Sequence, residues 1–136
     1  MKLAYLILVH RLPTQVIKLV NTLLADKEVS VFIHVDAKSK GVDESIKHEF
    51  KNNKRVIFTP YRYKVYWGSY NQIRATLLLM KTATANGEFE YYSLISGQDM
   101  LIKPISKFRD YLKENSGKEF MIHFKLPNPG NWGGNG

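Results

Sequence analysis

The sequence contains no cysteine among its 136 residues. This absence excludes disulfide bonds, thiolate metal sites and a cysteine nucleophile. The sequence also lacks a run of about 18 apolar residues, the length that a membrane-spanning helix needs. Its apolar segment Leu3–Val9 is shorter than that and is not followed by the small-residue cleavage site of a signal peptide. We therefore expect a cytoplasmic protein and leave peripheral association with a membrane open.

Motifs that define several common kinds of site are missing as well. The four histidines lack the short spacing of a zinc-binding helix, and no Asp-x-Asp triplet is present to hold Mg²⁺ or Mn²⁺. Neither the phosphate-loop motif nor the Gly-x-Gly-x-x-Gly fingerprint occurs. We therefore expect no metal and no cofactor. Lys or Arg side chains would then have to neutralise any bound diphosphate.

The charge is strongly basic, with 20 Lys and Arg against 12 Asp and Glu and a net charge of +8. Such a charge favours an anionic partner, and nucleic acid, an anionic lipid surface and a nucleotide diphosphate all qualify. The basic residues are scattered, however, and form no arginine-rich run or known nucleic-acid motif. A solvated basic surface explains the charge equally well, and we expect no nucleic-acid partner.

Hydrophobic residues make up 44% of the chain, enough for one packed domain. Continuous apolar runs, typical of strands that are covered on both faces, alternate with segments of helical periodicity. Residues 14–25 show that periodicity through Val16, Leu19, Val20, Leu23 and Leu24. The alternation predicts an α/β fold with a mostly parallel, doubly wound sheet and helices on both faces. Strands are expected at 3–9, 29–36, 55–59, 91–95 and 119–124, and helices at 14–25, 43–50, 73–85 and 104–114.

The composition changes near the C-terminal end of the sequence. Residues 126–136 are rich in Pro, Gly and Asn and cannot add to a core. We expect one unit over residues 1–125, followed by a loop or the end of a truncated chain.

Polar clusters follow three of the predicted strands. They are His10-Arg11, the segment from His34 to Asp36 with Lys38 and Ser39, and Ser96-Gly97-Gln98-Asp99. In open α/β sheets, ligands bind where such loops converge beyond the carboxyl ends of the strands. An aspartate there can accept hydrogen bonds from a uracil imide or a ribose hydroxyl, and a glycine lets a bulky ligand approach the backbone.

Each of these residues also has a structural interpretation. Asp36 and Asp99 could cap the turns that follow them, and His34 is more typical of a core histidine whose hydrogen bonds are satisfied. Trp67 could serve as a stacking platform or pack in the core, and its position slightly favours packing.

Four sequence blocks carry a family resemblance: AYLILVH at 4–10, FIHVDAKS at 32–39, VYWGS at 65–69 and YSLISGQD at 92–99. In order and spacing they resemble the Core-2/I-branching β-1,6-N-acetylglucosaminyltransferase and xylosyltransferase family, glycosyltransferase family 14. The resemblance covers about residues 3 to 125. His-Val-Asp-x-Lys-Ser together with Trp-Gly is fairly specific, whereas Ser-Gly-x-Asp alone is weak.

The resemblance implies a GT-A-type fold that uses a UDP-sugar donor and is incomplete in this chain. Residues 1–125 would be its nucleotide-sugar-binding half, and we expect no transferase turnover from this chain alone. It also implies inversion at the anomeric carbon, no required metal, and transfer of N-acetylglucosamine, xylose or another sugar to a glycan acceptor. By the same resemblance, the nucleotide would be surrounded by Val9, His10, Asp36, Trp67 and Gly68.

The resemblance also assigns the remaining parts of the site. Gly97 and Asp99 would lie on the sugar or diphosphate side. Family members commonly carry Asp-Tyr-Pro or Asp-Phe-Pro where this sequence has Asp99-Met100-Leu101, so the sugar side departs from the family pattern. The catalytic residue is unassigned, because the family's glutamate base is expected beyond Gly136.

Two rival hypotheses stay open. One is a non-catalytic nucleotide- or nucleic-acid-binding module, in which bases stack on the aromatic residues of 61–67 and phosphates meet Arg62 and Lys64. The other is a truncated chain that persists only beside a partner or does not fold stably.

Overall fold

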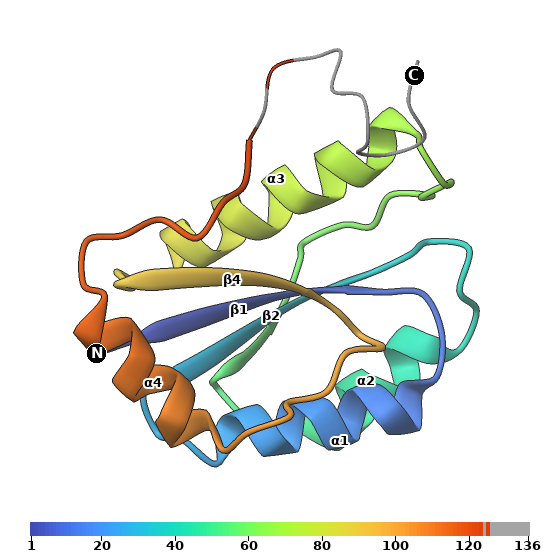
Figure 1. Ribbon diagram of the computed structural model, residues 1–136. Coiled ribbons are helices and arrows are strands. Elements are labelled where there is room, and N and C mark those ends of the chain that lie inside the picture. Colours follow the sequence, from blue (N-terminus) through green and yellow to red (C-terminus); the bar gives the residue numbers. More distant parts are fainter. Residues whose placement is uncertain (124, 126–136) are drawn as a thin grey trace.

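The computed structural model describes residues 1–123 and 125 of the chain. In these residues, a four-stranded sheet has the order β3-β2-β1-β4, and all of its neighbouring strands run parallel. Figure 1 shows the sheet between two helical layers. The strands are β1 (Leu3–Val9), β2 (Val29–Val35), β3 (Val56–Phe58) and β4 (Tyr91–Ser96). This arrangement is an α/β, Rossmann-like fold, and the predicted fold class is confirmed.

Four helices in the described chain cover the two faces of the sheet (Figure 1). Helix α3 lies alone on one face, while α1, α2 and α4 lie on the other. None of these helices is both long and apolar enough to cross a membrane. Their bounds are α1 (Pro13–Leu24), α2 (Val42–Phe50), α3 (Tyr70–Ala85) and α4 (Ile105–Glu114).

The core is divided by the sheet into two parts. The larger part joins one face of β1 and β2 to the apolar faces of α1 and α2 and to Leu112 of α4. Helix α1 buries the five residues that its periodicity predicted, because residues three and four apart share one face of a helix. The smaller part packs Leu79 and Ala83 of α3 against Leu6 and Phe32. Strands β1 and β2 are therefore buried on both faces.

The sequence at 91–95 predicts a buried fourth strand, and the prediction of its burial is wrong. β4 pairs only with β1 and forms an edge of the sheet, and its burial alternates along the strand. Leu94 is 50% exposed, because α3 packs mainly against β1 and β2 and hardly touches β4. A run of apolar residues does not distinguish an edge strand from a central strand.

The predicted fifth strand at 119–124 is also absent from the residues that the structure describes. Residues 119–123 form no ladder, and Met121 and Ile122 are exposed. A strand needs a hydrogen-bonded neighbour, and no described strand pairs with this segment. Residue 124 and the predicted loop at 126–136 lie outside the described residues.

Arg55, just before β3, forms hydrogen bonds with the turn between α1 and β2. Its Nη1 donates to the carbonyls of Asp26 (2.7 Å) and Val29 (3.2 Å), and its Nη2 donates to the carbonyl of Leu24 (3.1 Å). One guanidinium thereby satisfies three carbonyls at the amino-terminal edge of the sheet.

We predict that Arg55→Met lowers the free energy of unfolding by about 2 kcal/mol, because three carbonyls lose a charged donor. The methionine keeps the apolar stem, so the change isolates the hydrogen bonds. Urea denaturation measures the effect. The neighbouring, exposed Lys54 supplies the control, and Lys54→Met should change stability by less than about 0.5 kcal/mol. Equal losses in the two variants would contradict the role of Arg55.

Candidate functional site

A cavity of about 570 Å³ lies at the carboxyl edge of the sheet. It is bounded by the ends of β1, β2 and β4 and by the segment that leads into α3. The parallel strands place their carboxyl ends together, so loops far apart in sequence meet here. The lining residues are Leu8, Val9, His10, His34, Asp36, Lys38, Val65, Tyr66, Trp67, Gln72, Leu94, Ile95, Ser96 and Asp99.

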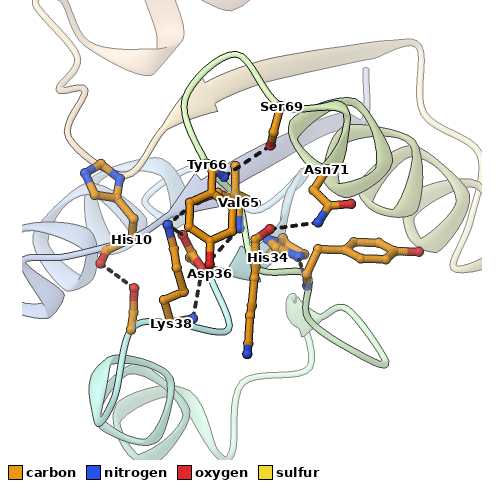
Figure 2. A network of polar contacts seen from close by, with 11 residues as sticks. His10, His34, Asp36, Lys38, Val65, Tyr66, Ser69 and Asn71 are labelled. Atoms are coloured by element: carbon orange, nitrogen blue, oxygen red, sulfur yellow. Dashed lines mark hydrogen bonds and ion pairs between the residues drawn. The ribbon is translucent and has the colours of Figure 1, made fainter.

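Asp36 is the centre of the polar network at this edge (Figure 2). Its backbone N–H donates to the carbonyl of Val9 at 2.7 Å, which extends the β1–β2 ladder by one bond. Its Oδ1 accepts the N–H of Lys38 at 2.9 Å and the N–H of Val65 at 3.3 Å. The carboxylate therefore caps its own turn and also holds the segment before α3. This geometry confirms the capping role, while contact with a ligand stays a prediction.

Lys38 places a positive charge in the wall of the cavity. Its Nζ lies 3.4 Å from Asp36 Oδ2 and donates to the carbonyl of Val65. The same ammonium lies 4.0 Å from the centre of the Tyr66 ring, where a cation–π interaction is favourable. The sequence analysis grouped Lys38 with Asp36 but assigned it no contact, since sequence gives no sign of the direction in which a lysine points.

Trp67 is not a core residue. Its side chain is 94% exposed at the mouth of the cavity, so the expectation that slightly favoured packing is wrong. The tryptophan sits in a turn that the N–H of Ser69 closes on the carbonyl of Tyr66 at 3.0 Å. The turn lies between β3 and α3 at the cavity, and Trp67 belongs to neither of the two apolar clusters of the described residues. Gly68 has a φ of +67° in the same turn and faces a neighbouring hollow rather than the main cavity.

Arg62 points away from the cavity and into an ion pair. Its Nη1 lies 2.8 Å from Oδ1 of the buried Asp43 at the start of α2. Burial alone would raise the pKa of Asp43, but hydrogen bonds from neighbouring side chains and the charges of Arg62 and Lys47 lower it below its ordinary value. Arg62 therefore takes part in an ion pair that stabilises the fold and does not line the cavity. The nucleic-acid hypothesis had given this side chain a phosphate contact.

Gly97 is placed by packing. Its N–H donates to the carbonyl of Leu8 at 2.8 Å, and a Cβ at this position would lie 3.0 Å from Cγ2 of both Val9 and Val16. Gly97 is not among the lining residues, so the geometry explains this glycine by helix and strand contact. Asp99 is exposed at the cavity, and its Oδ2 accepts the N–H of Ser96 at 2.7 Å.

The structure therefore brings five of the seven predicted residues around one cavity: Val9, His10, Asp36, Trp67 and Asp99. Sequence reasoning missed the contributions of Tyr66 and of Gln72 in the first turn of α3. Tyr66 belongs to the aromatic segment that the sequence singled out, whereas Gln72 gave no signal. The ligand roles of all these residues stay predictions.

No three His, Asp or Glu side chains in residues 1–123 and 125 come close enough together to hold a metal ion. Whether the protein uses a metal or a cofactor stays a prediction from the sequence.

A sequence model of the Core-2/I-branching enzyme family matches residues 3–134, nearly the whole chain. The chain belongs to the Core-2/I-branching enzyme family. Core-2/I-branching enzymes are glycosyltransferases, and membership makes glycosyltransfer the general activity of this protein. A comparison with individual curated proteins found no significant match.

In this Core-2/I-branching enzyme, Gly97→Ala should lower the free energy of unfolding by about 1–3 kcal/mol, because the new methyl group overpacks the contact with Val9 and Val16. Chemical denaturation measures the loss. The penalty should be smaller in a Val9→Ala background, which removes one of the two methyl groups at 3.0 Å. If the alanine is tolerated without cost in both backgrounds, the packing explanation is wrong.

Proposed function

We propose that the cavity at the carboxyl edge binds the nucleotide of a UDP-sugar. We further propose that the protein acts as an inverting, metal-independent glycosyltransferase that transfers N-acetylglucosamine or another sugar to a glycan acceptor. The supporting observation is the convergence of Val9, His10, Asp36, Trp67 and Asp99 on one cavity in a member of a glycosyltransferase family.

The cavity suits a nucleotide in size and in lining. Its volume of about 570 Å³ falls within the range of small-molecule sites. Apolar atoms of Leu8, Val9 and Ile95 line it and offer contact to a flat ring. The exposed indole of Trp67 adds an aromatic face on which a base can stack.

Asp36 is the acceptor that we assign to the uracil or the ribose. Its Oδ1 already accepts two backbone N–H groups, whereas its Oδ2 is approached by Lys38 Nζ at 3.4 Å. An imide N–H or a ribose hydroxyl donates to Oδ2 in the proposed complex. Asp36 is only 5% exposed, so its position is fixed before the ligand arrives.

Lys38 is the cation that we assign to the anionic side of the donor. Its ammonium is in the wall, close to Asp36 and over the Tyr66 ring. Attraction to a diphosphate does not depend on a metal. The absence of an Asp-x-Asp triplet from the sequence supports metal independence.

The proposed reaction is a single displacement. A carboxylate base takes the proton from an acceptor hydroxyl, whose oxygen attacks the anomeric carbon while the bond to UDP breaks and the configuration inverts. Basic groups stabilise the charge that develops on the departing diphosphate. We assign the base to no residue among those that the structure describes.

We predict that the protein binds UDP in the presence of EDTA, and that it binds UDP more tightly than UMP or ATP. Asp36→Asn keeps an Oδ1 acceptor for the two backbone N–H groups but removes the charge, and it should weaken UDP binding about tenfold or more. Isothermal titration calorimetry measures both effects.

The matched control is Asp110→Asn, at an exposed position on α4, which should leave the affinity for UDP unchanged. Absence of UDP binding by a folded wild-type chain, or equal affinities for UDP and ATP, would argue against the proposed donor. Loss of binding on addition of EDTA would instead reject metal independence.

A further inference from the structure

His34 is a buried polar side chain that forms part of the wall of the cavity. It lies on β2, is 1% exposed and stands two residues before Asp36. Its Nε2 accepts the backbone N–H of Tyr63 at 3.0 Å, as Figure 2 shows. Its ring stacks on the Tyr63 ring, with the ring centres 6.1 Å apart and the planes 21° apart. Nε2 is thus satisfied inside the fold, as expected of a core histidine, but the residue also lines the cavity, which the sequence analysis did not expect.

The hydrogen bond requires the neutral form of the imidazole. A neutral ring has one nitrogen without a proton, and only that nitrogen can accept. The bond to Tyr63 assigns Nε2 as this acceptor and places the proton on Nδ1. Protonation of Nε2 would set two donors against each other at 3.0 Å.

This contact fixes the chain that forms one wall of the cavity. The Tyr63 carbonyl accepts the N–H of Ala37 at 3.0 Å, so both polar backbone groups of Tyr63 bind to β2 and the turn after it. Two residues later the N–H of Val65 binds Asp36, and Val65, Tyr66 and Trp67 all line the cavity. His34 therefore controls the start of a segment whose end contacts the site.

We propose that His34 is a positioning residue of this site: its neutral imidazole holds residues 63–67 against β2, and its protonation releases this segment and weakens ligand binding. The effect on binding rests on the proposed UDP site, whereas the effect on the segment does not.

The charged and titratable groups around His34 determine the direction of its response to pH. Burial lowers the pKa of His34 below its ordinary value of 6.5, and the nearby charge of Arg62 acts in the same direction. Asp36, at the end of the same strand, opposes this shift, and the Tyr63 phenol ring stacks on the imidazole. Arg74 of α3 lies over the Tyr63 ring, with its guanidinium carbon 4.4 Å from the ring centre.

The lowered pKa gives a definite pH window. Between the folded-state pKa and 6.5, the unfolded or released chain binds more protons than the folded one. The positioning is therefore complete above 6.5 and is lost as the pH falls through the lowered pKa. At neutral pH the imidazole stays uncharged and the segment stays in place.

The test compares wild type with His34→Gln, whose side-chain oxygen can accept the Tyr63 N–H but does not titrate, and with His34→Leu, which cannot accept. Long-range ¹H–¹⁵N NMR follows the tautomer and ionisation of His34. Hydrogen exchange follows protection of the Tyr63 N–H between about pH 8 and pH 5. Calorimetry follows UDP affinity over the same range, and the exposed His48 of α2 supplies the control, His48→Gln.

We expect the Tyr63 N–H of the wild type to lose protection as His34 gains its proton, and UDP affinity to fall with it by up to about tenfold per pH unit. His34→Gln should bind UDP nearly as well as the wild type at high pH and should show a shallower pH dependence, whereas His34→Leu should bind weakly throughout. His48→Gln should follow the wild type. Ionisation of UDP itself acts on every variant alike, so the difference between wild type and His34→Gln isolates His34.

Tyr63 protection that does not depend on His34 ionisation would overturn the proposal. Identical pH profiles of UDP binding in wild type and His34→Gln would overturn its second half. If no variant binds UDP, the proposed function fails, and the exchange of the Tyr63 N–H still decides whether His34 positions the segment.

Discussion

Burial of β1 and β2 on both faces is the constraint on which the rest of the structure depends. A strand between two helical layers has no solvent for polar side chains to reach, so nearly every position from Leu3 to Val9 and from Val29 to Val35 is apolar. Polar chemistry is thereby confined to the residues just after these strands. Within β2, His34 is a buried polar exception, and the Tyr63 N–H satisfies its Nε2.

Asp36 connects this constraint to the cavity. The carboxylate follows directly after a buried strand, closes its own turn and holds Val65 of the opposite wall. The interactions that shape the cavity are therefore part of the fold, and this wall is ordered without a ligand. A site built in this way loses less conformational entropy on binding than one whose loops must be organised by the ligand.

The sequence predicted what depends on local pattern and missed what depends on distant neighbours. The apolar run of β1 and the periodicity of α1 each identify one buried surface, so their positions were predicted well. The exposure of β4 depends on whether α3 packs against it, and the same residues could also form a covered strand. The segment 119–123 has strand-forming residues, but no described strand pairs with it.

The candidate site shows the same division. Strand ends identified His10, Asp36 and Asp99, because topology alone brings those ends to one edge, whereas Val9 was identified by the family resemblance. The exposure of Trp67, the ion pair of Arg62 with Asp43 and the packing of Gly97 against Val16 depend on three-dimensional contacts that spacing does not encode.

The strand order has a kinetic consequence. β1, β2 and β3 follow one another along the chain and neighbour one another in the sheet. β4, in contrast, pairs with β1, from which it is separated in sequence by β2, β3 and three helices. Closing that long loop costs more entropy than joining successive strands, so β4 should dock after the other three have assembled. The cavity is complete only when the end of β4 reaches the ends of β1 and β2. In a refolding chain, formation of the cavity would therefore mark the last stage of assembly.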